Sequence, residues 1–423
     1  MTARQSALAL AVLAAIAAPV VPVLPERSLD EIAQEVDPSA WRARFPVQYE
    51  QWRAPSRIEK QWNEKRGHAF SLKDRDESWP QSDARWAVLG EGRPKLRPLP
   101  AACLDCHASE APSGATYWEA RRSAKTPVAC IRCHEAWASD ISNKASGRSD
   151  PGGAGFSPPR ASALQTDPAR LASETCAGCH TEYYIENGRV VRPDPALLST
   201  AGGSNSKSAI PAIPNARALE KYYDRTRRTG WTHAGGAALI EPRHPQAQMY
   251  AAGPHAANRV ACPDCHMPRD ARGISDHRMV DPLENIDAAC TGCHRLDSAE
   301  LRARVKTIQD RTEAAESRAL DALVALISSI RDAAASGAPA QQLARAREFQ
   351  RRAQWRIAFV EADRSKGFHA PDEAAALLLE AIDYARRGQM ALPAAARRTT
   401  RPAKPAATLP SPRASPPTRM PPA

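Results

Sequence analysis

The pattern of hydrophobic and polar positions is clearest in the last third of the chain, where it predicts a long helix. From Leu301 to Ile330, apolar residues recur at steps of three and four positions, the spacing of one buried helix face. Asp297-Ser298-Ala299-Glu300 before this run resembles a capping box, and Gly337 and Pro339 end the pattern. We predict one helix of about 38 residues, roughly 57 Å long at a rise of about 1.5 Å per residue.

Two more helices are predicted after it. One runs from about residue 340 to 365, with Trp355 and Phe359 on or near its buried side. The other begins after Pro371, a residue suited to a first helical turn, and ends near Gly388. These helices are expected to pack as a bundle on the rest of the molecule, with a dimer interface as an added possibility.

The beginning of the chain has the composition of a targeting segment. An uncharged stretch rich in Ala, Leu and Val follows Arg4 and runs from Gln5 to Pro25, which is typical of an export signal. An uncleaved membrane anchor is the competing hypothesis because the stretch approaches spanning length, although Pro19 and Pro22 disfavour a membrane helix. Under either hypothesis the folded part is exported.

The cysteines supply the candidate chemistry. All ten belong to five copies of Cys-x-x-Cys-His, the attachment signature of c-type haem, in which the thiols bind the haem vinyl groups and the histidine binds iron. Zinc sites and disulfides also use cysteine pairs, but a histidine directly after every pair favours haem over both. The copies are Cys103, Cys106 and His107; Cys130, Cys133 and His134; Cys176, Cys179 and His180; Cys262, Cys265 and His266; and Cys290, Cys293 and His294.

Composition agrees with a core packed by haem. Aromatic residues make up only 5% of the chain, so five haems would supply missing apolar mass. The formal net charge of +11 omits the haem propionates, which add about ten negative charges when ionised. We therefore do not expect nucleic acid as a partner.

Five haem irons have ten axial positions, and the attachment motifs fill five of them. Six other histidines remain as candidates for the opposite faces, so counting alone does not decide whether one iron stays open. The six are His68, His233, His244, His255, His277 and His369.

Many short stretches between His68 and about residue 386 resemble the ammonia-forming cytochrome c nitrite reductases, which are exported pentahaem enzymes. They occur in family order around the five motifs. The matching stretches are Arg66-Gly67-His68-Ala69-Phe70, Cys179-His180-Thr181-Glu182-Tyr183-Tyr184, Tyr222-Tyr223-Asp224, Trp231-Thr232-His233, His244-Pro245, Ala252-Gly253-Pro254-His255, Cys265-His266-Met267-Pro268, Asp276-His277, Ala353-Gln354-Trp355-Arg356 and His369-Ala370-Pro371.

The resemblance implies a ligand for each iron but one. It makes His277 the distal ligand of the second haem, His68 of the third, His369 of the fourth and His255 of the fifth. The first haem is left with an open distal face, over which the family places a tyrosine, a histidine and an arginine. Tyr183 and His244 match the first two, and Arg85 is the preferred arginine, with Arg93 as the alternative.

Two positions depart from the usual family pattern. Most members carry lysine as the proximal ligand of the catalytic haem, whereas this chain has His107, as a subset of the family does. The usual calcium site includes a glutamate beside the catalytic tyrosine and a glutamine before the catalytic histidine. Glu182 is kept, but the glutamine position is Arg243, so we expect a salt bridge between the two and no bound calcium.

The resemblance implies a mainly α multihaem cytochrome c with a haem-packed core, little β-structure and long C-terminal helices. It implies six-electron reduction of nitrite to ammonium at the first haem, fed through four bis-histidine haems by a quinol dehydrogenase or a small cytochrome. The alternatives are a pentahaem electron-transfer cytochrome and a reductase of a related substrate such as hydroxylamine. We expect a periplasmic homodimer, with membrane association through the N-terminus as a further possibility.

The expected organisation follows from these assignments. The expected parts are a signal peptide or N-terminal anchor at 1–25, a pentahaem catalytic domain at 26–296, a long-helix region at 297–388 that forms a dimer interface and supplies His369, and a disordered tail at 389–423.

Overall fold

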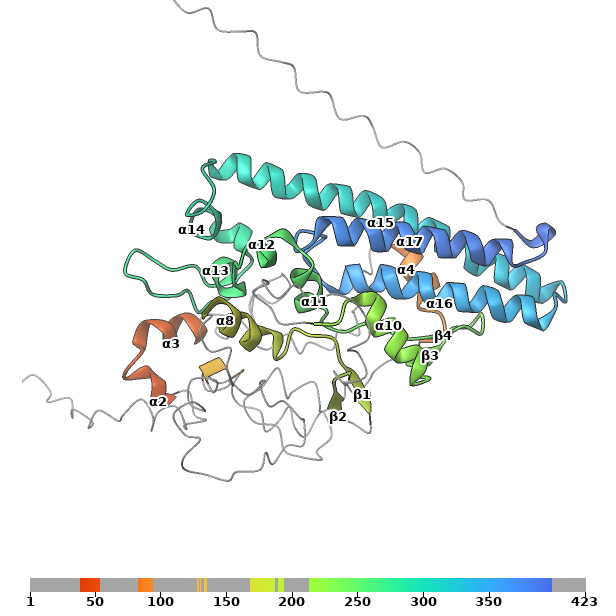
Figure 1. Ribbon diagram of the computed structural model, residues 1–423, viewed down its shortest axis with the longest axis horizontal. Helices are drawn as coiled ribbons and strands as arrows, with labels where there is room; N and C mark the ends of the chain where they lie inside the picture. Colours follow the sequence, from red (N-terminus) through yellow and green to blue (C-terminus); the bar gives the residue numbers. More distant parts are fainter. Residues whose placement is uncertain are drawn as a thin grey trace, which may run out of the picture.

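The computed structural model describes residues 39–53, 83–93, 128, 130, 133–134, 168–186, 189–193 and 213–397. The fold is mainly helical with little sheet, as predicted (Figure 1). The shorter elements are α2 (Ser39–Arg42), α3 (Pro46–Arg53), α4 (Ala84–Leu89), α8 (Pro168–Ala177), β1 (Tyr184–Glu186), β2 (Arg189–Val191), α10 (Ala216–Arg225), β3 (Trp231–Thr232), β4 (Ala238–Leu239), α11 (Gln246–Ala251), α12 (Pro254–Ala257), α13 (Cys262–His266), η3 (Pro282–Asn285), α14 (Ile286–Cys290) and η4 (Ala394–Ala396).

The longest helix, α15 (Ser298–Ala335), has the 38 residues that the hydrophobic pattern predicts. At its start the Asp297 side chain accepts a hydrogen bond of 2.7 Å from the backbone amide of Glu300. At its end Gly337 has φ +72°, and the next amide, that of Ala338, donates to the carbonyl of Ala333 at 2.9 Å. This closing turn needs a left-handed residue, which explains the glycine.

Helices α16 (Ala340–Ala362) and α17 (Pro371–Met390) complete the bundle beside α15 (Figure 1). The sequence predicts that this last helix ends near Gly388, and in the structure α17 continues for two more residues, to Met390. A Cβ at Gly388 would lie 2.8 Å from the Leu326 methyl carbons and 3.1 Å from Phe349 Cβ. The glycine therefore lets α17 approach α15 and α16 rather than ending the helix.

One hydrophobic core joins the bundle to the elements that precede it in sequence. It includes buried residues of α4, α10 and the β3–β4 hairpin together with all three long helices. The buried Trp355 indole donates to the carbonyl of Ala216 at 3.0 Å, and the Gln354 amide donates to the carbonyl of Leu89 at 3.0 Å. These bonds fix α4 and α10 against α16.

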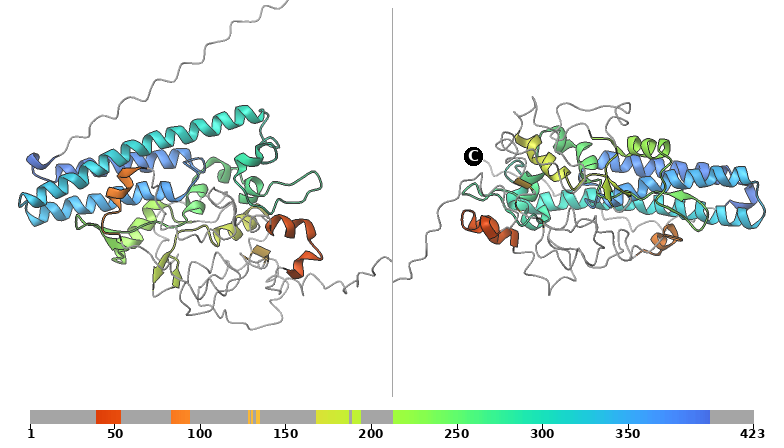
Figure 2. Two further views of the ribbon diagram at one scale, coloured as in Figure 1. Left: turned by 180° about the vertical axis from the view of Figure 1, so that it is seen from behind. Right: turned by 90° about the horizontal axis from the view of Figure 1, so that it is seen from below.

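The short helices that carry most candidate ligands lie beside one half of the bundle. Helices α8, α11, α12 and α13 lie close together there, and α14 leads into the start of α15 (Figures 1 and 2). Both sheets are two-stranded antiparallel hairpins, and β1 follows Tyr183 directly. Among the residues that the structure describes, no helix is both long and apolar enough to cross a membrane.

Candidate functional site

Three pairs of histidines, each joining an attachment motif to a distant segment, face one another. The ring centres of His134 and His277 are 6.3 Å apart with planes at 19°. Those of His266 and His369 are 6.4 Å apart at 70°, and those of His255 and His294 are 6.2 Å apart at 84°. Each pair matches one of the ligand pairs predicted for the second, fourth and fifth haems.

These separations fit axial ligation of one iron by both rings. Two imidazoles bound on opposite sides of a metal place their ring centres about 6.3 Å apart, because each metal–nitrogen bond is about 2 Å and each ring centre lies roughly 1.1 Å behind its nitrogen. The residues present are therefore suited to hold haem iron. The predicted partners His68, Cys103, Cys106 and His107 lie outside the described residues.

Hydrogen bonds at Nδ1 orient several of these rings and leave Nε2 for a metal. Nδ1 of His277 lies 2.8 Å from the carbonyl of Ser275, and Nδ1 of His266 lies 3.4 Å from that of Val280. Nδ1 of His180 lies 3.4 Å from Oε1 of Gln246. An imidazole held in this way is in the neutral tautomer that binds metals.

Burial keeps most of these rings neutral. It lowers the pKa of His134 to about 4, with His277 contributing, and it lowers the pKa of His180, His255 and His266.

His369 is the exception because a carboxylate contacts it. Burial alone would lower its pKa, but the charge of Asp363 and a hydrogen bond of 2.7 Å between Nδ1 and Oδ1 outweigh burial and raise it. Asp363 also accepts a hydrogen bond from the Ser365 hydroxyl, which in turn accepts one from the His369 amide.

The two predicted catalytic side chains lie together. The rings of Tyr183 and His244 stack with centres 5.8 Å apart and planes at 13°, and Tyr183 is 8% exposed. His244 has φ +51°, a strained conformation for a residue other than glycine. Its ring centre also lies 6.1 Å from that of His180, with the planes nearly perpendicular at 87°.

Glu182, which is buried, joins the segments that carry these two rings. Its carboxylate accepts hydrogen bonds from the Tyr223 hydroxyl at 2.9 Å and from the backbone amide of Arg243 at 2.5 Å. Its own amide donates to Gln248 Oε1 at 3.1 Å. Burial raises the pKa of Glu182 to about 8, although the Arg243 and Tyr223 hydrogen bonds and the charge of Arg243 oppose the rise.

The contact between Glu182 and Arg243 differs from the predicted one. Sequence reasoning predicts a salt bridge between their side chains, and the structure joins them through the backbone amide of Arg243, with the guanidinium acting through its charge. Each Glu182 oxygen accepts a hydrogen bond, one from Tyr223 and one from Arg243. Within the described part of the chain, no cluster of His, Cys, Asp and Glu is arranged to hold a metal ion.

The two candidate arginines occupy different places. Arg85 donates to Asp83 and, through Nη1, to Ser317 and to Asp321 at 2.7 Å, so its guanidinium ties α4 to α15. Arg93 forms a bidentate, mostly buried ion pair with Glu241, with contacts of 3.0 and 2.9 Å. Since Glu241 stands three residues before His244, Arg93 is held beside the segment that carries the site.

His233 is the sixth loose histidine, and both of its ring nitrogens have partners in the fold. Nε2 lies 2.9 Å from the carbonyl of Val88, and Nδ1 accepts from the amide of Gly235 at 2.9 Å. It is 1% exposed, and burial lowers its pKa. This pattern is that of a structural histidine.

Sequence reasoning missed Asp363, Gln246 and Gln248. No metal or haem motif includes them. The contacts of Gln246 with His180 and of Gln248 with Glu182 join separate segments, whereas Asp363 contacts His369 within one loop. The sequence did offer one indication for Asp363. It stands six residues before His369 in the segment between two helices, close enough to contact that histidine.

Comparison with known proteins gives a consistent family match. The family model described as Cytochrome c552 matches residues 57–415. A cytochrome c-552 of Aliarcobacter butzleri is 30% identical over 352 residues, covering 79% of this chain and 67% of that protein. One of Desulfotalea psychrophila is 26% identical over 405 residues, covering 84% of this chain and 74% of that protein.

A solved structure shares the fold. The cytochrome c nitrite reductase catalytic subunit of Desulfovibrio desulfuricans, a protein with two calcium sites, matches with a TM-score of 0.59 and 21% identity. The match covers 84% of this chain and 85% of that one.

Proposed function

The chain belongs to the cytochrome c552 family, and from this we propose that it is a pentahaem enzyme that reduces nitrite to ammonium. The family consists of c-type cytochromes, and ten cysteines in five Cys-x-x-Cys-His motifs supply the attachment sites for five covalent haems. When bound, the haems supply electrons one at a time and an iron site for the substrate.

We propose that four haems are bis-histidine carriers and that the first is open. The ring separations of 6.3, 6.4 and 6.2 Å support the pairs His134–His277, His266–His369 and His255–His294. The third pair, His180 with His68, and the proximal ligand His107 of the first haem are carried over from the family resemblance.

The single observation that carries the enzyme proposal is the stacked pair of Tyr183 and His244. Nitrite reduction consumes six electrons and eight protons, so a site for it needs proton donors beside the bound oxyanion. The Tyr183 hydroxyl and the His244 imidazole are such donors, and Glu182 fixes the segments that carry them.

For the third site residue we propose Arg93, because it is held beside the segment that carries His244, although both guanidinium groups have carboxylate partners. The Arg85 guanidinium is used by Asp83, Ser317 and Asp321, which makes it a tie to α15. The Arg93–Glu241 pair stands close in sequence to His244, where a cation would help hold an anion.

A specific observation also supports a second function. The 6.1 Å between the ring centres of His244 and His180 suits axial ligation as well. With His233 committed to the fold, five loose histidines remain for five irons. If His244 binds the third iron and His68 the first, every haem is six-coordinate and the protein is an electron-transfer cytochrome. His244 thus decides between the two functions.

Two substitutions test this point. For His244→Asn we expect nitrite turnover to fall by about 10²- to 10⁴-fold, the usual contribution of a proton donor, with five haems and an unchanged spin-state spectrum. Tyr183→Phe should also lower turnover, whereas Tyr184→Phe, which removes the neighbouring hydroxyl, should leave it near wild type. A new high-spin haem in His244→Asn would instead identify His244 as an axial ligand and support the electron carrier.

The remaining proposals rest on the family resemblance. We propose an exported, periplasmic homodimer that meets its copy through the long helices and takes electrons from a quinol dehydrogenase or a small cytochrome. Hydroxylamine is a proposed secondary substrate. We also propose that this chain holds no calcium at the Glu182 position, unlike the Desulfovibrio protein with its two calcium sites.

A further inference from the structure

Helices α2 and α3 lie against the second histidine pair, outside the part of the chain that the family model matches. That match begins at residue 57, whereas the two helices end at Arg53. They contact one candidate haem pair from outside the matched residues.

Trp41, on α2, packs on the proximal ring of this pair. Its ring centre lies 5.4 Å from that of His134 with the planes at 32°, and it is 8% exposed. Phe45 packs on Trp41 in turn, with the two ring centres 5.9 Å apart. A large buried ring in this position restricts rotation of the imidazole and keeps water from it.

Helix α3 holds the distal side of the same pair. Gln51 Oε1 accepts a hydrogen bond of 3.1 Å from the backbone amide of His277, whose Nδ1 is held by the carbonyl of Ser275. The Trp52 indole donates to the carbonyl of Val128 at 2.9 Å, two residues before Cys130. The two helices thus contact both segments that carry the pair.

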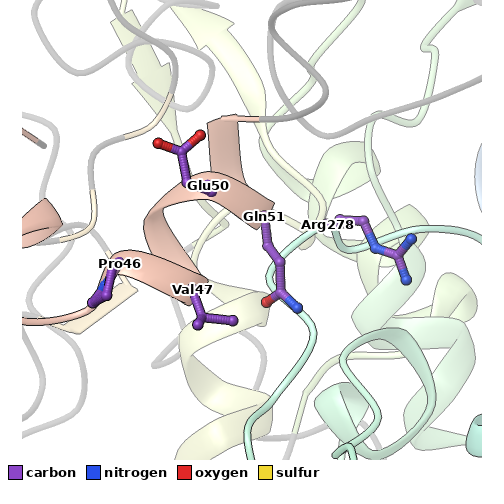
Figure 3. A pocket seen from close by; sticks show the side chains of 5 residues that line it. All are labelled: Pro46, Val47, Glu50, Gln51 and Arg278. Atoms are coloured by element: carbon purple, nitrogen blue, oxygen red, sulfur yellow. The ribbon is translucent and has the colours of Figure 1, made fainter. Parts of the chain in front are cut away.

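A hollow of about 560 Å³ lies beside α3, between that helix and the residue that follows His277 (Figure 3). Pro46 and Val47 give it an apolar side, and Glu50, Gln51 and Arg278 complete its lining. Asp276 holds the Arg278 guanidinium with contacts of 2.5 to 3.0 Å. The Arg278 side of the hollow, opposite α3, is therefore held by the same segment that carries His277.

We propose that the α2–α3 segment is a positioning clamp for the second haem, which holds His134 and His277 in nearly parallel planes and shields this haem from water. The proposal rests on the bis-histidine ligation proposed above and makes Trp41 and Gln51 positioning residues. Ligand orientation and solvent exposure are two of the means by which a protein sets a haem potential.

The ring planes make this haem distinguishable by electron paramagnetic resonance. Nearly parallel imidazoles give a low-spin ferric haem a rhombic signal, whereas nearly perpendicular ones give a more anisotropic signal. The planes of His134 and His277 differ by 19°, against 70° and 84° in the other two described pairs. Among the three described pairs, the rhombic signal is therefore expected from this haem alone.

The test compares substitutions in the full, haem-loaded chain. For Trp41→Ala we expect the rhombic signal to shift or broaden and its midpoint potential to fall, because water stabilises the more highly charged ferric form. Gln51→Ala should alter the same signal, while Trp41→Phe and Gln51→Glu should restore much of it. Gln48→Ala, the same change three residues before Gln51 on α3, is the matched control and should leave it unchanged.

Haem content and the signals of the other haems are measured in the same samples. If Trp41→Ala and Gln51→Ala leave the rhombic signal and its potential unchanged, or if Gln48→Ala alters them equally, the clamp is refuted. Absence of a rhombic signal from the wild type would also refute it. Nitrite turnover and the high-spin signal of the first haem are measured separately. A failure of the proposed enzyme activity can therefore be told apart from a failure of the clamp.

Discussion

At the scale of single residues, the hydrogen-bond partners of three proposed axial histidines distinguish the proposed haem sites from one another. His277 and His266 donate to backbone carbonyls, whereas His369 faces the buried carboxylate of Asp363 at 2.7 Å. A carboxylate partner makes an imidazole a stronger donor, which stabilises ferric iron. Among the described pairs, the fourth haem should therefore have its potential lowered most by its surroundings.

The substitution Asp363→Asn tests this effect. We expect one low-spin haem to titrate at a higher potential than in the wild type while five haems stay bound. Asp372→Asn, a charge-matched change in the first turn of α17, is the control. A potentiometric titration in which both variants reproduce the wild-type curve would show that Asp363 does not tune the haem.

Glu182 leads to a prediction about calcium. The Glu182 carboxylate accepts hydrogen bonds from the Tyr223 hydroxyl and the Arg243 amide, and the positive charge of Arg243 acts on it, which disfavours a divalent cation at the same place. Treatment with a chelator should leave nitrite turnover and thermal unfolding unchanged. Loss of turnover on chelation that calcium restores would contradict this prediction.

Site residues differ in how far the sequence could predict them. Tyr183 and His244 stand in short motifs that resemble a family, and the structure stacks their rings. Trp41 acts through packing on a distant segment, and Asp363 acts through the turn of the loop between α16 and α17, neither of which a haem motif records. Arg85 was the preferred arginine and Arg93 the alternative, and the sequence does not show that Asp321 on α15 contacts Arg85.

At the scale of elements, the junction of α11 and α12 meets the loop between α16 and α17. Gly253 stands at this junction, two residues before His255, and a Cβ there would collide with the backbone carbonyl of His369. Because the colliding atom belongs to the backbone, relieving the clash would require the His369 segment to shift, which costs stability. The close approach ties the ligand loops of the fourth and fifth haems together.

We expect Gly253→Ala to lower the free energy of unfolding by about 3 kcal/mol and to disturb two haems at once. The measurement is thermal unfolding together with the low-spin signals of the fourth and fifth haems. Gly230→Ala, where a Cβ would make only ordinary contacts of 3.5 Å or more, is the control. If Gly253→Ala is as stable as this control and its haem signals are unchanged, the close contact between the two loops does not couple the fourth and fifth haems.

The long helices were predictable because their signals are local. A periodic apolar face, a capping aspartate at 297 and a glycine at 337 define α15, and the structure confirms all three. The short helices α11 to α14 lack such signals, since each is only four to six residues long and depends on its surroundings.

At the scale of the whole molecule, the function depends on which histidines meet across the fold. Local pattern predicted five attachment motifs, but the pairing of His134 with His277 joins segments that are far apart in the sequence, with Gln51 of the N-terminal helix α3 bonded to His277. Counting left six candidates for five irons, and the fold resolves one of them by burying His233 against Val88. The central claim is that the first haem keeps an open face beside Tyr183 and His244.

The most direct test of that claim is the spin state of the five haems in the oxidised, substrate-free protein. Electron paramagnetic resonance and near-infrared magnetic circular dichroism count low-spin bis-histidine haems and detect a high-spin or water-ligated one. The proposed enzyme predicts four low-spin haems and one high-spin or water-ligated haem that changes on addition of nitrite. Five low-spin bis-histidine haems that are unaffected by nitrite would contradict it.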